Sequence, residues 1–243
     1  MMDSSRIHPA DEMYKTGLIS FQGDEAKARD FYTKSGHAIC DRVANWLREH
    51  GRDPSQLSIL DFACGYGRVT RHFAKVFGEV TVSDLEPEML GFISELCGAE
   101  GFLSNIDLAR VKWPPRDFDV VFTYSLFTHL HPEIWSAWFE AVSERVRPGG
   151  FMFLTTRGVE FARRTGEAVA EGEQVRFTEK NETEGRLDTS IYGRTTLARE
   201  FVDDVLKGQH RPLPMSRAGY FKGGEFDQYQ DVHVLVRATG VRG

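Results

Sequence analysis

The stretch that decides the fold is Leu57–Arg71, which reads L-S-I-L-D-F-A-C-G-Y-G-R-V-T-R. Its first part, Leu57–Phe62, is a short apolar run of the kind that forms a buried parallel strand. The residues Asp61–Gly67 then read D-x-A-x-G-x-G, a turn that is poor in side chains. Apolar residues recur at helical spacing from Gly67 to Phe77, and Gly78 is expected to end that helix. The stretch therefore predicts a strand, a glycine loop and a helix.

A glycine loop between a strand and a helix is suited to holding a nucleotide-like ligand. Glycine has no Cβ, so backbone N–H groups and a helix N-terminus can approach the ligand closely. A dinucleotide fingerprint would require a third Gly or Ala at position 70, where this chain has Thr70. A phosphate-binding P-loop would require Gly-Lys-Ser/Thr, and no such triplet occurs in the sequence. The first observation disfavours NAD or FAD, and the second disfavours a nucleotide bound by a P-loop.

A second strand completes the pattern. Val80–Ser83 is rich in β-branched residues and is followed by Asp84, about 20 residues beyond the glycine loop. A carboxylate at that point can accept hydrogen bonds from both hydroxyls of a ribose. Pro87 then begins a helix that is expected to run to Cys97 and to end before Gly98.

Two motifs together resemble the class I S-adenosylmethionine-dependent methyltransferases. They are L-D-F-A-C-G-Y-G-R-V at 60–69 and V-T-V-S-D-L-E-P-E-M-L at 80–90. The run F-D-V-V-F-T-Y-S-L-F-T-H-L at 118–130 is similar to the fourth-strand motif of that family, and P-G-G at 148–150 is similar to the turn before its fifth strand. One departure is Ala63, where the family usually has glycine. We expect that its methyl group tightens the loop slightly without loss of binding.

The resemblance implies a site for S-adenosyl-L-methionine. Asp84 would hold the ribose, and Asn105, or alternatively Asp107, would hold the adenine amino group. Tyr32 in Y-T-K-S-G would lie near the cofactor. An ordinary half-buried aromatic role for Tyr32 and a turn-capping role for Asn105 remain open. The residues expected to contact the cofactor are Tyr32, Asp61, Ala63, Gly65, Gly67, Asp84, Leu85, Met89, Asn105, Ile106, Ser125 and Leu126.

The expected reaction is an in-line methyl transfer to a small molecule, with a sugar-linked or other metabolite hydroxyl as the leading hypothesis. The protein would mainly align the reactants and exclude water, so no metal is required. His129 is the candidate general base, because an ordinary imidazole titrates near neutrality. The alternative is that His129 caps the next helix or holds its loop. His131 is expected to be a solvent-facing turn residue.

Composition favours a soluble cytoplasmic protein that acts on small molecules. The net charge of −6 and the scattered basic residues disfavour nucleic acid as a partner. Cys40, Cys64 and Cys97 are far apart, which argues against a disulfide framework and fits a reducing compartment. No stretch is long and apolar enough to span a membrane, and the start lacks the apolar region of a signal peptide. The oligomeric state stays open.

We expect one domain over residues 1–243, with an α/β, Rossmann-like, doubly wound and mostly parallel sheet of about seven strands and an antiparallel C-terminal strand. Residues 1–56 would form a helical cover, with an irregular start to Gly23 and a break in the helix at Tyr32–Gly36. The other parts are the cofactor-binding core at 57–156, an insertion or lid without regular structure at 157–194, and a C-terminal helix with strands at 195–243.

Two other function classes are compatible with these motifs. A catalytically idle cofactor-binding or regulatory protein would keep the glycine loop and Asp84 but would not methylate an acceptor. A nicotinamide-dependent oxidoreductase would bind NAD(H), although Thr70 disfavours it. Cofactor titration combined with a methyl-transfer assay would separate the three.

Overall fold

A computed structural model describes residues 5–166, 173–180, 187–208, 215–227 and 229–239. The chain divides into two compact units, Met1–Pro115 and Arg116–Gly243, and each is described by itself. The division into a cover, a core, a lid and a C-terminal part stays a prediction.

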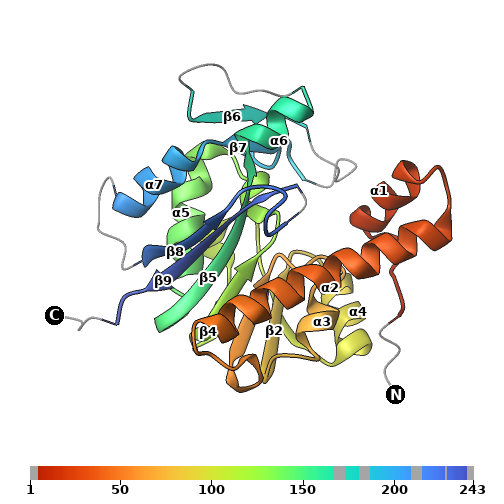
Figure 1. Cartoon of the computed structure of the whole chain (residues 1–243), viewed down its shortest axis with the longest axis horizontal. Helices are drawn as coiled ribbons and strands as arrows, with labels where there is room; N and C mark the ends of the chain where they lie inside the picture. The colour runs from red at the N-terminus through yellow and green to blue at the C-terminus, as the bar shows by residue number, and fades with distance from the viewer. Residues whose placement is uncertain (1–4, 167–172, 181–186, 209–214, 228, 240–243) are drawn as a thin grey trace. The chain divides into compact units, whose positions relative to one another are not determined.

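The first unit begins with two helices, α1 at Glu12–Ser20 and α2 at Glu25–Glu49 (Figure 1). Asp11 caps α1 by accepting a hydrogen bond from the backbone N–H of Tyr14 at 3.0 Å, and Asp24 caps α2 in the same way. The prediction of an irregular start to Gly23 is therefore wrong for residues 12–20. The first four residues lie outside the described part.

Helix α2 runs without interruption through Tyr32–Gly36, so the predicted break is wrong. The glycine in that run serves close packing instead. A Cβ placed on Gly36 would lie 2.2 Å from the carbonyl oxygen of Arg68, which directly follows the glycine loop. Arg68 also donates a hydrogen bond to Ser35 at 2.9 Å. Helix α2 is thereby packed directly against the loop.

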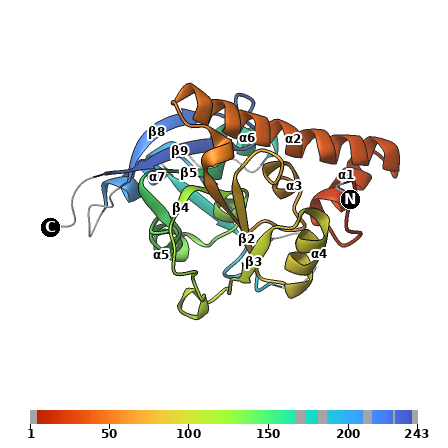
Figure 2. The same ribbon diagram turned by 90° about the horizontal axis from the view of Figure 1, so that it is seen from below.

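Three parallel strands form the sheet of the first unit. They are β1 at Ser58–Phe62, β2 at Glu79–Asp84 and β3 at Glu100–Leu103, in the order β3-β2-β1. Helix α4 has the predicted bounds, Pro87–Cys97, and lies beside β3 (Figure 2). Gly98 ends it in the left-handed conformation. Since the strands are parallel and in register, the residues that follow them gather at one edge of the sheet.

The helix after the glycine loop is shorter than predicted. Only Thr70–Phe73 is helical, as α3, and turns continue the chain to β2. Gly78 is not a left-handed helix end. Its backbone N–H donates to the carbonyl oxygens of Pro54 and Leu57, and a Cβ there would lie 2.4 Å from the carbonyl of Ser55. The short 3-10 helix η1 at Pro54–Gln56 thus requires a glycine at this crossing.

The second unit contains a mixed sheet. Strand β4 at Phe118–Thr123 is parallel to β5 at Val146–Gly158, while β9 at Asp231–Arg237 is antiparallel to β5 and to β8 at Met215–Phe221 (Figure 1). The antiparallel C-terminal strand was predicted, although β5 starts earlier than expected and includes the P-G-G turn. Helix α5, Pro132–Ser143, buries an apolar stripe that consists of Trp135, Trp138, Phe139 and Val142.

The segment predicted to lack regular structure contains helix α6 at Val159–Arg164 and strand β6 at Val175–Thr178. Strand β6 pairs with β7 at Arg194–Leu197, which continues alongside β5. The next helix, α7, begins at Arg199 and ends at Lys207, so the predicted start at Thr195 is wrong. With β6 and β7 the described residues contain nine strands instead of about seven. Two further 3-10 turns are η2, Leu108–Arg110, and η3, Leu126–Thr128.

Candidate active site

The glycine loop at the carboxyl end of β1 has three residues in the left-handed conformation. Ala63, Gly65 and Gly67 have φ angles of 64°, 56° and 76°. A residue with a Cβ pays roughly 1–2 kcal/mol for this conformation, so Ala63 is the strained member of the set. A Cβ on Gly65 would meet nothing within 4 Å. The loop therefore presents an open side at Gly65, as a ligand cradle requires.

Asp84 lies beside that open side. Its two carboxylate oxygens accept hydrogen bonds from the backbone N–H groups of Gly65 and Leu85, each at 2.7 Å. The side chain is half-buried. Each carboxylate oxygen can accept more than one hydrogen bond, so the geometry fits additional donors such as ribose hydroxyls. Asp84 thus holds the loop in shape and is placed to meet a ligand.

Asp61, at the end of β1, is buried beneath the loop. Its Oδ2 accepts a hydrogen bond of 2.6 Å from the hydroxyl of Thr70. Burial raises the pKa of this carboxyl to about 7, and the nearby charge of Asp84 acts in the same direction. Asp61 therefore connects β1 to α3 through the hydroxyl of Thr70.

The residues expected at the adenine end cap turns. Asn105 Oδ1 accepts from the backbone N–H of Asp107 at 2.9 Å, and Asp107 Oδ1 accepts from that of Ala109 at 3.1 Å. Ile106 between them is an exposed large apolar side chain. The turn-capping alternative thus describes Asn105 as it stands, and its contact with adenine stays a prediction.

The N-terminal segment adds contacts that the sequence did not reveal. His8 stacks on Tyr66 of the glycine loop, with ring centroids 4.2 Å apart, and meets Phe92 of α4 edge-on. Met89, an expected cofactor contact, is buried in a cluster with Tyr66 and Phe92. The structure therefore places Met89 in the packing that supports the loop.

Arg71 links the glycine loop to the N-terminal segment. Its guanidinium is buried and donates to three carbonyl oxygens, those of Gly67 at 3.0 Å, Tyr66 at 3.4 Å and Arg6 at 2.6 Å. No motif pointed to Arg71, since its partners are backbone atoms.

Tyr32 is used inside the first unit. Its ring is buried, and its hydroxyl donates to Asp11 Oδ2 at 2.5 Å. Burial together with the charge of Asp11 raises the pKa of the phenol well above its ordinary value. Tyr32 therefore ties α2 to the N-cap of α1, and a direct contact with cofactor stays a prediction.

In the second unit, Ser125 follows β4 in the left-handed conformation with a φ of 64°. Its backbone N–H donates to Thr155 Oγ1 on β5 at 2.8 Å. Leu126 next to it is buried. A serine held in this strained conformation at the end of a strand is typical of functional turns.

His129 follows η3 and is oriented by residues 192 and 193. Its Nδ1 lies 2.7 Å from the carbonyl oxygen of Gly193, and its ring stacks on Tyr192 with centroids 4.9 Å apart. Because a carbonyl only accepts, Nδ1 carries the proton. In the neutral ring Nε2 is then the nitrogen able to accept a proton.

The helix cap belongs to His131 and not to His129. His131 Nδ1 accepts from the backbone N–H of Glu133 at 3.3 Å, and the ring contacts Phe177 of β6 edge-on. His131 is partly exposed, as a solvent-facing position requires, and it also caps α5. Of the two alternatives to a base for His129, capping is excluded, while its bonds to Gly193 do hold the loop.

The described residues contain no group of three or more His, Cys, Asp or Glu side chains placed to hold a metal ion. In the same part of the chain, every helix is too short or too polar to cross a membrane.

Comparison with known protein families identifies the core of the chain. Residues 59–150 match the family described as "Methyltransferase domain". This stretch contains the glycine loop, Asp84 and the end of β4. The match agrees with the predicted resemblance to the class I S-adenosylmethionine-dependent methyltransferases. No curated protein sequence matches the chain.

Solved methyltransferase structures share the fold over nearly the whole chain. DesVI from Streptomyces venezuelae is 19% identical, with a TM-score of 0.60 over 96% of this chain and 100% of that one. CalS10, an amino pentose methyltransferase from Micromonospora echinaspora solved with S-adenosylmethionine, is 20% identical, with a TM-score of 0.59 over 84% and 92%. The magnesium protoporphyrin IX methyltransferase from Synechocystis PCC 6803 is 17% identical, with a TM-score of 0.59 over 94% and 97%. The predicted Rossmann-like fold class is confirmed.

Proposed function

We propose that this methyltransferase moves the methyl group of S-adenosylmethionine to a hydroxyl of a small molecule, with a sugar-linked metabolite as the leading candidate. Support for the cofactor comes from the open side of the loop at Gly65 beside the Asp84 carboxylate. Relatives of the same fold that bind the cofactor or its product, and one that acts on an amino pentose, agree with this choice.

The proposed chemical step uses His129 as the general base. When bound, the cofactor supplies an electrophilic sulfonium methyl, so the protein's own task is to orient the acceptor and remove its proton. The Gly193 carbonyl fixes the proton on Nδ1 of His129, which presents Nε2 as the accepting nitrogen. A hydroxyl needs such a base at neutral pH, whereas the sulfonium needs no activation.

The test replaces His129 with alanine. His129→Ala should slow the chemical step roughly 10²- to 10⁴-fold and leave the affinity for S-adenosylhomocysteine unchanged. The matched control is His131→Ala, which removes the cap of α5 and should cost stability without slowing the chemistry. The measurements are single-turnover methyl transfer to a panel of monosaccharides and calorimetric cofactor binding.

Two outcomes would overturn parts of this proposal. Equal turnover in the His129→Ala variant would leave the histidine only a loop-holding role. Tight cofactor binding by the wild type with no transfer to any hydroxyl- or amine-bearing compound would favour the idle cofactor-binding alternative.

A further inference from the structure

An unexplained polar group lies at one end of the sheet in the second unit. Strand β9 is antiparallel to β5, and Asp231 at its start pairs with Thr156 near the end of β5. Gln230, just before β9, is therefore at the carboxyl end of β5. Ser125 lies at the same end, because its backbone N–H bonds to Thr155. Ligands of open α/β sheets bind at such carboxyl ends.

Only one of the two polar atoms in the Gln230 carboxamide forms a hydrogen bond with the described part of the chain. Its Nε2 donates to Ser125 Oγ at 2.7 Å, while its buried Oε1 has no hydrogen-bond partner among the described residues. Exchanging the two ends of the amide would leave the same imbalance. A buried polar atom without a partner lowers stability, so its presence calls for a functional reason.

The backbone around Gln230 is held firmly. Asp227 is buried, and its Oδ1 accepts from the backbone N–H groups of Tyr229 and Gln230 at 2.9 and 2.7 Å. Its Oδ2 accepts from the hydroxyl of Tyr124, the last residue before Ser125, at 2.9 Å. Asp227 thus fixes the backbone of Gln230 and connects it to the end of β4.

We propose that Gln230 Oε1 accepts a hydrogen bond from an O–H or N–H group of the methyl acceptor and so helps to select it. This rests on the proposed function. Beside Gln230, Tyr229 adds an exposed aromatic side chain packed edge-on against Phe161. A hydroxyl- or amino-bearing monosaccharide has these properties.

The acceptor is the better ligand for Gln230 than the cofactor. The family match ends at residue 150, and every expected cofactor contact except Tyr32 lies within the matched part of the chain. Residues outside that part, including 227–231, are where acceptor choice can differ among proteins of one fold.

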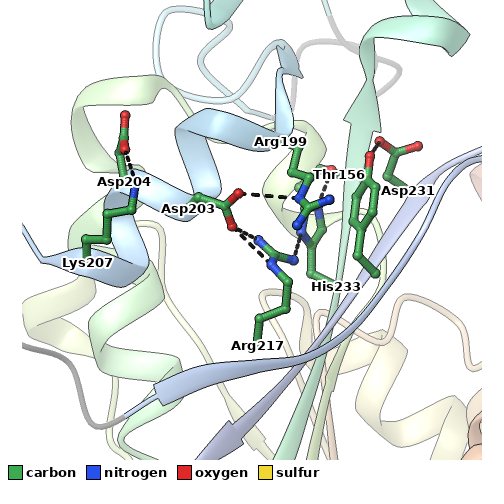
Figure 3. A network of polar contacts seen from close by, with 9 residues as sticks. Thr156, Arg199, Asp203, Asp204, Lys207, Arg217, Asp231 and His233 are labelled. Atoms are coloured by element: carbon green, nitrogen blue, oxygen red, sulfur yellow. Dashed lines mark hydrogen bonds and ion pairs between the residues drawn. The ribbon is translucent and has the colours of Figure 1, made fainter.

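The first test needs no acceptor. Gln230→Met keeps the length of the side chain and removes both the unpartnered oxygen and the Nε2 donor to Ser125 Oγ. The first change relieves a cost and the second loses a hydrogen bond, so the Tm of the ligand-free protein should stay near that of the wild type. The matched control is Thr156→Val. Arg217 donates to His233 Nδ1, so Nε2 of the buried His233 carries the proton and donates to Thr156 Oγ1 at 2.9 Å (Figure 3). Removing that acceptor should lower the Tm.

A fall in the Tm of Gln230→Met as large as that of Thr156→Val would give the glutamine a structural role and overturn the proposal. The second test measures transfer to hydroxyl- and amino-bearing monosaccharides. Gln230→Met should raise the KM for the acceptor about tenfold, with the Kd for S-adenosylhomocysteine unchanged. An unchanged KM, or an equal loss of cofactor affinity, would refute the assignment to the acceptor. Failure of the wild type to bind S-adenosylhomocysteine would refute the proposed function instead, and the Tm comparison would still decide the role of Gln230.

Discussion

At the scale of a single residue, the carboxylate of Asp84 has two roles. The carboxylate fixes the glycine loop through the N–H groups of Gly65 and Leu85, and it is the predicted partner of the ribose. Any substitution there therefore changes both the loop and the ligand contacts.

Asp84→Ala should weaken S-adenosylhomocysteine binding by roughly 2 to 4 kcal/mol, because two charge-assisted hydrogen bonds to the ribose are lost. It should also lower the Tm, since two backbone donors lose their acceptor. The matched control is Asp53→Ala, which removes an exposed carboxylate that likewise accepts a backbone N–H, from Ser55 at 3.0 Å. Calorimetry that finds equal affinity for Asp84→Ala and Asp53→Ala would refute the ribose contact.

Asp61 makes stability depend on pH. Its pKa is raised from 3.8 to about 7 in the folded protein, so between these values the folded state binds a proton that the unfolded state releases. The contribution of Asp61 to the free energy of unfolding therefore falls as pH rises from about 4 to 7. It is fully present only at the acid end of that window.

Asp61→Asn isolates this effect, because the amide stays neutral and can still accept from Thr70. Relative to the wild type, the variant should gain stability as pH rises from about 4 to 7, and the gain should level off above that range. Buried histidines such as His233, whose pKa burial lowers, affect both proteins equally and cancel in the difference. Denaturant unfolding at several pH values measures the difference in the free energy of unfolding between the two proteins. A difference that does not change with pH would show that Asp61 is ionised throughout this range.

At the scale of an element, the chain just before β7 shapes the surroundings of His129. Leu130 forms a bridge with Tyr192, and the backbone N–H of His131 donates to Ile191 at 2.9 Å. The end of the predicted insertion is therefore joined to the loop of the candidate base. Whether the whole of 157–194 is a lid stays a prediction, and residues 167–172 and 181–186 of it lie outside the described part.

Tyr192→Leu should slow the chemical step up to about tenfold, because the aromatic stack that orients His129 is worth about 1 kcal/mol. Cofactor affinity should not change. Tyr192→Phe keeps the ring and should retain nearly the wild-type rate and the wild-type pH–rate profile. If the leucine variant is as fast as the phenylalanine variant, the stack has no positioning role.

Element prediction succeeded where a periodic pattern agreed with the packing. Helix α4 and the strands β1 and β2 carry apolar patterns, and Pro87 and Gly98 mark the ends of the helix, so these elements were predicted well. Strands β6 and β7 have four residues each and no apolar alternation, so only their pairing defines them. Gly36 and Gly78 were interpreted as a helix breaker and a helix end, yet both serve close backbone contacts that only the folded chain reveals.

The residues of the candidate site, like the helices and strands, could be predicted from the sequence only in part. The glycine loop and Asp84 follow from local motifs, because a strand, a turn and the next strand fix their geometry. Arg71, His8 and Gln230 were missed, because each acts through partners distant in sequence or through backbone atoms. Their roles depend on tertiary packing and leave no spacing pattern.

At the scale of the whole molecule, cofactor binding should appear as added stability. S-adenosylhomocysteine at about 100 times its Kd should raise the free energy of unfolding by about 2.7 kcal/mol, or the Tm by roughly 5 to 10 °C. NAD⁺ at the same concentration should not shift the Tm, because position 70 lacks the third small residue of the dinucleotide loop. A shift with NAD⁺ alone would restore the oxidoreductase hypothesis.

The guanidinium of Arg71 binds the N-terminal segment by donating a hydrogen bond to the backbone carbonyl oxygen of residue 6. Every amino acid supplies such an oxygen. Evolution can therefore exchange the side chain of residue 6 without losing this contact. The spacing is constrained instead, because His8 must still reach Tyr66 two residues later. Among homologues we expect substitution at position 6 to lose only the exposed ion pair with Glu95 and the contact with Phe92, and we expect selection against insertions or deletions between positions 6 and 8.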